Sequence, residues 1–296
     1  MKSGFSLTRV IMFKRVLLSM DSSSAAMELF NCIPDLRIMG MKELVILHVI
    51  SAELLQGESP DVHKEIFRKR LEGKLRALEK KGVSVKLLMP MGHPSEVVAQ
   101  VAEEEDVDLI LIGSIGESVM REFFLGSTVT DVIRRSTKPV LVEKYISLGE
   151  KTHLLPIFLQ KWASVLLPTD FSKAADEVYF KFLEVANNIH KITLLHVVEK
   201  ERHGKNPGQQ KEEAERILEG WKEKFLQHGA NVDISIVHGV PSQQIVNVAE
   251  SEGATLIALP SRGVGLTSLV LGRTADAVMR SSGAPVLLFK QAQDDD

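Results

Sequence analysis

The chain has 296 residues, of which 44% are hydrophobic and 25% charged, a balance typical of soluble globular proteins and long enough for two domains. Its net charge of −3 gives no general attraction to nucleic acid or to an anionic membrane, and no apolar run approaches the roughly 20 residues of a membrane helix. The single cysteine, Cys32, excludes a disulfide within the chain and favours a reducing, cytoplasmic setting.

The first half of the chain alternates apolar runs with amphipathic segments. Phe67, Leu71, Leu75 and Leu78 recur at intervals of three and four residues, which predicts a helix with one apolar face that ends near Gly82. Continuous apolar strands separated by helices indicate a parallel sheet with helices on both faces. Five apolar runs predict strands at residues 15–19, 44–49, 83–89, 109–112 and 140–142.

A glycine-rich loop follows the fourth predicted strand. Gly113 and Gly116 are separated by two residues, and Gly126 follows after nine more, directly before Ser127 and Thr128. Glycines allow a positive φ and a close approach of the backbone to a ligand. A predicted helix over residues 129–135 adds unpaired N–H groups and two hydroxyls, which suit an anion. The loop therefore predicts a phosphate site at the carboxyl end of a parallel strand, although a tight turn without a ligand is the alternative.

Two further polar positions stand at the ends of predicted strands. Asp21 ends the first strand; its carboxylate could cap a helix over residues 22–30, or accept a bond from a ribose hydroxyl or an adenine amino group. His48 and His196 end the second strand of each half. We interpret them as hydrogen-bonded packing residues rather than catalysts, because no nucleophile accompanies them in the sequence.

The two halves are copies of one domain. The run ending at Asp21 matches the run ending at Asp170, 149 residues later. The separation of matching residues falls to 146 at Pro139 and Pro285, as expected when loops differ in length between the copies. The repeat predicts a first domain over residues 1–146, a linker over 147–160 and a second domain over 161–296.

The second loop departs from the first. Pro260 replaces the first glycine and so removes an N–H, and the spacing from Gly263 to Gly272 is one residue shorter than in the first copy. Arg273 takes the place of the first serine, before Thr274. An arginine can still pair with a phosphate as a charged fork, so a second, weaker site stays open.

These residues resemble the universal stress protein family over nearly the whole chain. The family's loop pattern is Gly, two residues, Gly, nine residues, Gly, then Ser or Thr, and Gly113, Gly116, Gly126 and Ser127 fit it. The resemblance implies an α/β fold of two tandem doubly wound domains, each a five-stranded parallel sheet flanked by helices, of the adenine-nucleotide alpha hydrolase-like type.

The resemblance also implies a function and an assembly. ATP or AMP, with or without Mg²⁺, is the expected ligand, and a stress-response sensor or regulator is the expected role. The last strands of the two domains are expected to pair in an internal pseudo-twofold, and two chains to form a homodimer. The implied nucleotide-binding residues are Asp21, Val49, Gly113, Gly116, Gly126, Ser127 and Thr128, with Asp170, Val197, Gly263, Gly272, Arg273 and Thr274 as the weaker second site.

No catalytic or metal-binding residue is predicted. The chain lacks a Gly-x4-Gly-Lys-[Ser/Thr] run, and neither a Ser-His-Asp arrangement nor metal-ligand spacing of histidines can be read from it. Slow ATP hydrolysis is the most that a bound triphosphate would support. Two alternatives to the sensor therefore stay open, namely a weak ATPase and an interaction scaffold that needs no nucleotide.

Overall fold

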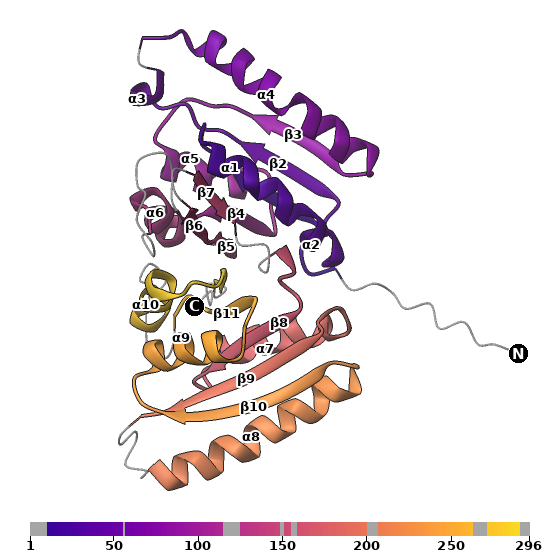
Figure 1. Cartoon of the computed structure of the whole chain (residues 1–296), viewed down its shortest axis with the longest axis vertical. Coiled ribbons are helices and arrows are strands. Elements are labelled where there is room, and N and C mark those ends of the chain that lie inside the picture. Colours follow the sequence, from indigo (N-terminus) through magenta and orange to yellow (C-terminus); the bar gives the residue numbers. More distant parts are fainter. Residues whose placement is uncertain are drawn as a thin grey trace, which may run out of the picture.

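The computed structural model describes residues 11–55, 57–114, 125–148, 151–154, 159–199, 207–262 and 271–290. One ten-stranded sheet runs through both halves of the molecule, from β3 at one end to β10 at the other (Figure 1). Among the described residues, no helix combines the length and the apolar character needed to cross a membrane.

The N-terminal half contributes five parallel strands in the order β3-β2-β1-β4-β5. The strands are β1 (Arg15–Ser19), β2 (Glu43–Leu47), β3 (Ser84–Leu88), β4 (Leu109–Gly113) and β5 (Val140–Glu143). The helices are α1 (Ser24–Glu28), α2 (Ile33–Ile38), α3 (Ala52–Leu55), α4 (Pro60–Lys80), α5 (Pro94–Glu104) and α6 (Ser127–Arg135).

The C-terminal half repeats this arrangement in the order β10-β9-β8-β11-β12, so two five-stranded parallel sheets are confirmed. Its strands are β8 (Ser164–Thr169), β9 (Lys191–Val198), β10 (Asn231–His238), β11 (Leu256–Pro260) and β12 (Val286–Phe289). Its helices are α7 (Lys173–Glu184), α8 (Pro207–Gln227), α9 (Pro241–Ser251) and α10 (Arg273–Ser281).

Two hydrophobic layers cover the sheet, one on each face. The first layer packs α1, α2 and α4 of one half and α7 and α8 of the other against the strands, and it contains the apolar face of α4 that the sequence predicts, with Phe67 and Leu71 buried. The second layer packs α5, α6, α9 and α10 against the other face. The central strands send alternate residues into the two layers, which explains why they are largely apolar, whereas the outermost strands β3 and β10 also carry polar residues such as Lys86 and Asp233. Helices α4 and α8 lie along the two outermost strands (Figure 1).

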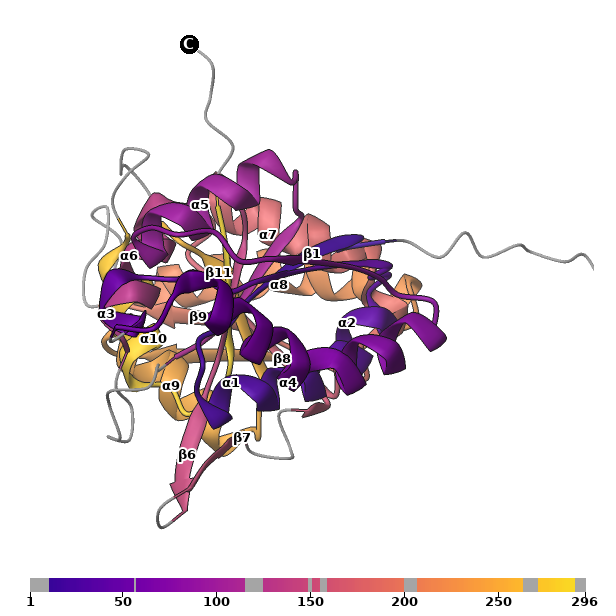
Figure 2. The ribbon, with the colours of Figure 1, turned by 90° about the horizontal axis from the view of Figure 1, so that it is seen from above.

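The two halves join where β5 and β12 pair antiparallel, and this confirms the expected pairing of the last strands. Val142 lies opposite Val286, and Val140 lies opposite Leu288. The linker between the halves contains a hairpin of β6 (Tyr145–Leu148) and β7 (Lys151–Leu154), which extends away from the body of the molecule (Figure 2).

A buried ion pair lies beside this seam. The Nζ of Lys161, the first residue of the predicted second domain, is 2.9 Å from Oε1 of Glu143 at the end of β5, and both side chains are fully buried. The N–H of Lys161 donates to Oδ2 of Asp35 in α2 at 2.8 Å, and the indole N–H of Trp162 donates to the carbonyl of Asp35 at 2.9 Å. Burial is the largest single effect on the pKa of Lys161 and lowers it. The charges of Glu143, Cys32 and Asp35 and the hydrogen bond to Glu143 together outweigh burial and hold that pKa above its ordinary value. The pair therefore attaches the start of the second domain to the first.

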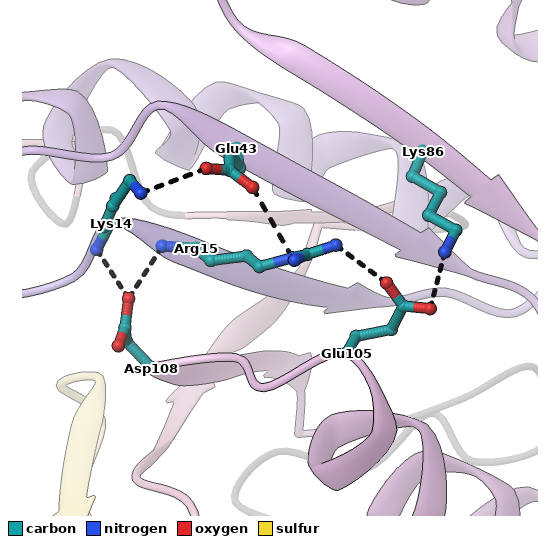
Figure 3. Close-up of polar contacts among 6 residues, drawn as sticks. All are labelled: Lys14, Arg15, Glu43, Lys86, Glu105 and Asp108. Atoms are coloured by element: carbon teal, nitrogen blue, oxygen red, sulfur yellow. Dashed lines mark hydrogen bonds and ion pairs between the residues drawn. The ribbon is translucent and has the colours of Figure 1, made fainter.

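A second polar network ties the amino ends of the strands at the edge opposite the loops (Figure 3). Oδ2 of Asp108 accepts the N–H groups of residues 14 and 15, each at 2.8 Å. Arg15 donates to Glu105 at 2.8 Å, and Lys86 of β3 reaches the same carboxylate at 2.6 Å, while Glu43 of β2 pairs with Arg15 at 3.7 Å. These partly exposed contacts fix the ends of the strands more than they stabilise the fold.

We expect Lys161→Met to lower the free energy of unfolding by about 3–5 kcal/mol, because it leaves the Glu143 carboxylate buried without its partner. Replacing both residues, as Glu143→Leu with Lys161→Met, should recover most of that loss. Urea denaturation followed by circular dichroism measures both. A double variant that is no more stable than the single one would contradict this account of the pair.

Candidate functional site

A cavity of about 400 Å³ opens at the carboxyl ends of β1, β2 and β4 in the N-terminal half. It lies within the range of volumes of ligand pockets. Six of the seven positions that the sequence nominates for the first site line it, and the seventh, Gly116, lies outside the described residues. The lining nominated in advance is Asp21, Val49, Gly113, Gly126, Ser127 and Thr128.

Helix α6 begins at this cavity without a side-chain cap. Its N-cap residue is Gly126, with φ −61° and ψ 150°, and no side chain accepts from the first turn. By contrast, Ser23, Ser59 and Ser172 cap α1, α4 and α7 with their hydroxyls. The first amides of α6 therefore keep their donor capacity toward the cavity, and the positive end of the helix dipole lies there. The helix begins two residues earlier than the sequence predicts, at Ser127, because Gly126 already has the extended backbone of an N-cap.

The roles expected of two glycines were wrong in part. Neither Gly113 nor Gly126 has a positive φ. Gly113 is required by packing instead, because a Cβ there would lie 2.5 Å from Cε2 and Oη of Tyr145. At Gly126 the nearest atom to a Cβ would be the carbonyl oxygen of Ser114 at 3.6 Å, an ordinary contact.

Tyr145 was not nominated from the sequence. It comes from the linker strand β6, is 8% exposed, and lines the cavity beside Gly113. Burial raises the pKa of its hydroxyl well above the ordinary value, with the charge of Glu143 as the next cause, so the phenol stays neutral. The repeat offers no signal for this residue, because the contact depends on the path of the linker.

The carboxylate at the other end of the cavity organises the start of α1. Oδ1 of Asp21 accepts from the N–H and the hydroxyl of Ser23, at 2.9 and 2.5 Å. Ser23 is itself the N-cap, so the alternative interpretation of Asp21 as the cap was wrong by two residues. Asp170 makes the same turn with the N–H of Ser172 at 3.1 Å. The turn holds each carboxyl group in place at the mouth of its cavity.

His48 forms part of the cavity wall and joins a buried histidine pair. Its Nδ1 lies 3.0 Å from the carbonyl oxygen of Met20, and its Nε2 lies 2.9 Å from Nε2 of His63 on α4. Because a carbonyl only accepts, Nδ1 of His48 carries the hydrogen and Nε2 must accept one from His63. The His48 ring also stacks on Phe67 at 3.9 Å between centroids. Burial lowers the pKa of His48, so the neutral form is the stable one.

His196 has the equivalent position in the second half. Its Nδ1 lies 2.9 Å from the carbonyl oxygen of Thr169, and its ring stacks on Phe171 at 4.5 Å. The interpretation of both histidines as hydrogen-bonded packing residues is confirmed.

The C-terminal half holds a second, larger cavity of about 600 Å³ at the matching ends of its strands. Pro260 lies in its wall, and Glu199 and Arg262, which the sequence reading missed, add one acidic and one basic side chain. Gly272 is the N-cap of α10 and provides no side-chain cap either. Gly263 lies outside the described residues, and the other nominated positions that line the cavity are Asp170, Val197, Gly272, Arg273 and Thr274.

Within the described ranges, no cluster of three or more histidine, cysteine or acidic residues could hold a metal ion. Cys32 is buried, and burial, followed by the charge of Glu143, raises the pKa of its thiol well above the ordinary value. The geometry is therefore that of two cavities, each lined by the uncapped N-terminus of a helix and by a carboxylate.

Comparisons with known proteins identify the repeat. The model of the universal stress protein family matches residues 12–144 and again residues 161–290. A universal stress protein of Methanocaldococcus jannaschii is 30% identical over 156 residues, which cover 45% of this chain and 96% of that protein. One of Mycobacterium bovis is 24% identical over 268 residues, 84% of this chain and 88% of that protein. The crystal structure of a universal stress protein from Archaeoglobus fulgidus shares the fold, with a TM-score of 0.69, 24% identity, and coverage of 96% of this chain and 98% of that one.

We expect Gly113→Ala to lower the free energy of unfolding by about 1–3 kcal/mol, because the added methyl group overlaps the Tyr145 ring. Gly126→Ala is the matched control at the other glycine, where the space is open and the backbone suits any residue, so its cost should stay below about 1 kcal/mol. Thermal and urea denaturation compare the two. Equal losses would show that Tyr145 does not select the glycine.

The buried His48 should make the fold sensitive to acid. Since its pKa is lowered in the folded chain, the unfolded chain binds the extra proton below about pH 6.5, and the free energy of unfolding falls with pH by up to about 1.4 kcal/mol per unit. His48→Asn keeps a donor near the Met20 carbonyl but cannot titrate. Urea denaturation at pH 7 and pH 5.5 should show a smaller loss for this variant, and an unchanged loss would exclude His48 as the cause.

Proposed function

Because this chain belongs to the universal stress protein family, we propose that its first domain binds an adenine nucleotide, ATP or AMP, and that the protein works as a sensor or regulator in the stress response. The observation that carries the proposal is the uncapped N-terminus of α6 at the edge of the 400 Å³ cavity. A helix that leaves its first amides open toward a cavity is suited to phosphate.

In this proposal the two ends of the cavity take different parts of the nucleotide. The phosphates lie at Gly113, Gly126, Ser127 and Thr128, where α6 supplies amides and the two side chains supply hydroxyls. The ribose and the adenine lie toward Asp21, with Val49 beside them as apolar lining. The family pattern adds Gly116 to the phosphate end. Binding at this site would change the surface that partner proteins meet.

The charge of the first cavity bears on the choice of ligand. Among the described residues that line it there is no lysine and no arginine. A triphosphate would therefore bring Mg²⁺ to offset its charge, whereas AMP needs only the helix N-terminus and the hydroxyls. ATP with Mg²⁺ and AMP without it are the two forms that the site suits.

We propose that the second cavity binds nucleotide more weakly than the first. Asp170, Val197, Gly272 and Thr274 keep the pattern of the first site, but Pro260 removes one backbone donor from the loop. Arg273 stands where the first copy has a serine, and its guanidinium is the group that would compensate.

The protein is further proposed to act in the cytoplasm as a homodimer. The buried free thiol of Cys32 is compatible with a reducing compartment. Since β5 and β12 already pair within one chain, a second chain would attach through another surface.

The test is to purify the protein gently, denature it, and quantify the released small molecules by mass spectrometry. We expect about one adenine nucleotide per chain. Gly126→Asp should abolish this, because the carboxylate caps α6, repels phosphate and meets no steric obstacle. Gly272→Asp is the matched control in the second domain and should leave the nucleotide of the first in place. Retained nucleotide in Gly126→Asp, or none in the unaltered protein together with no binding of added ATP or AMP, would refute the proposal.

A further inference from the structure

Two lysines directly follow the strands that pair at the seam. Lys144 comes after β5 and Lys290 comes after β12. Because these strands run antiparallel, each lysine leaves its strand beside the domain to which it does not belong. The two residues therefore have equivalent positions in the two copies.

Both lysines end at a carbonyl group of the opposite domain. The Nζ of Lys290 donates to the carbonyl oxygen of Ile133, in the last turn of α6. The Nζ of Lys144 donates to the carbonyl oxygen of Met279, in the last turn of α10. A cation at this end of a helix satisfies an unpaired carbonyl and interacts favourably with the helix dipole.

The Lys144 contact is shielded from solvent, and the Lys290 contact is partly shielded. Lys144 is 6% exposed, and burial together with the nearby charge of Arg280 lowers its pKa to about 8. Burial and the charge of Arg262 lower the pKa of Lys290 to about 8 in the same way. An ammonium group that has lost its water shell depends on its remaining hydrogen bond. Losing the carbonyl partner therefore costs more free energy here than at an exposed surface contact.

The other ends of the same two helices face the cavities. Gly126, Ser127 and Thr128 at the start of α6 line the first cavity, and Gly272, Arg273 and Thr274 at the start of α10 line the second. Each helix has nine residues, a rigid rod about 13 Å long. One end thus meets a cavity of its own domain while the other end is held by a lysine of the opposite domain.

We propose that Lys290 and Lys144 are positioning residues, each of which fixes the C-terminal end of a helix in the opposite domain, an arrangement that amounts to a crosswise hold. Ligand binding in one domain is thereby coupled to the seam and to the other domain. The crosswise hold rests on the contacts alone, whereas its effect on ligand rests on the proposed nucleotide site. A displacement of α6 by a ligand would move Ile133 relative to Lys290 and so act on β12.

The hold is tested in the full chain by hydrogen exchange and mass spectrometry without added ligand. Lys290→Met keeps the length of the side chain and removes the donor. It should speed exchange in residues 127–135 of the first domain and leave residues 273–281 of the second less affected. Lys144→Met should give the reverse pattern, and Lys→Arg at each position should restore protection. Faster exchange in the helix of the lysine's own domain, or equal change in both helices, would overturn the proposal.

The coupling to ligand is tested by titrating AMP in a background that carries Gly272→Asp, which leaves the first cavity as the binding site. Lys290→Met should weaken AMP binding about fivefold or more, although the substitution lies outside that cavity. Lys144→Met, whose contact lies in the second domain, should leave AMP binding unchanged, and Lys290→Arg should restore it.

The exchange and titration experiments distinguish failure of the crosswise hold, failure of the coupling and failure of the proposed function. If AMP fails to bind the unaltered protein, the proposed function is wrong, and the exchange pattern still decides the crosswise hold. If AMP binds equally well to the unaltered protein and to Lys290→Met, the coupling is wrong while the nucleotide site stands. Should a methionine variant fail to fold, the arginine variant, compared with Lys290→Gln by the same exchange measurement, decides whether a charged donor is needed.

Discussion

The two halves of the molecule meet where β5 and β12 pair antiparallel over three residue positions, and much of the structure depends on this short seam. Apart from Glu143 at the end of β5, both strands are apolar, and their free edges would be prone to aggregation if they faced water. Pairing them within one chain covers both edges and makes two five-stranded sheets into one. The same pairing directs the end of each strand toward the opposite domain, where Lys144 and Lys290 reach their carbonyl partners. The Glu143–Lys161 ion pair lies beside the seam, and Tyr145 lines the first cavity. The seam therefore reaches the first cavity through β6, and it reaches α6 and α10 through the residues that follow β5 and β12.

Much of this architecture could be predicted from the sequence, because its causes are local or repeated. Apolar runs located the five strands of the first copy within a few residues but did not predict the hairpin of β6 and β7, and the family resemblance implied the pairing of the last strands. The cavity positions were also predictable, since the carboxyl ends of parallel strands meet at one edge of a sheet. Contacts between distant segments were not. The partner of Gly113 is a tyrosine of the linker, and the partner of His48 comes from a helix 15 residues further along the chain. Spacing in one copy cannot reveal either contact, and the second copy offers no parallel to confirm them.

The glycines show how a correct position can have a different physical cause. A glycine in a phosphate loop suggests an unusual backbone angle, yet Gly113 and Gly126 have ordinary angles in the structure. One makes room for an aromatic ring, and the other begins a helix without offering a side chain to its amides. Gly113 shapes the cavity wall, and Gly126, whose N–H donates to the carbonyl of Ser114 next to Gly113, leaves the first amides of α6 without a side-chain cap. A sequence pattern can identify both residues while leaving their separate tasks to the structure.

The covalent connection between the two domains also changes how they find each other. Two separate domains would find each other at a rate set by their concentration, and like copies would pair as readily as unlike ones. Joined by a tether, the two copies in one chain meet at an effective concentration that dilution does not alter. Each first domain is therefore always matched with a second domain. Under that condition the second loop can exchange a serine for Arg273 and a glycine for Pro260 without producing pairs that lack the original loop altogether. Covalent continuity thus lets the two copies diverge in chemistry while their partnership stays fixed.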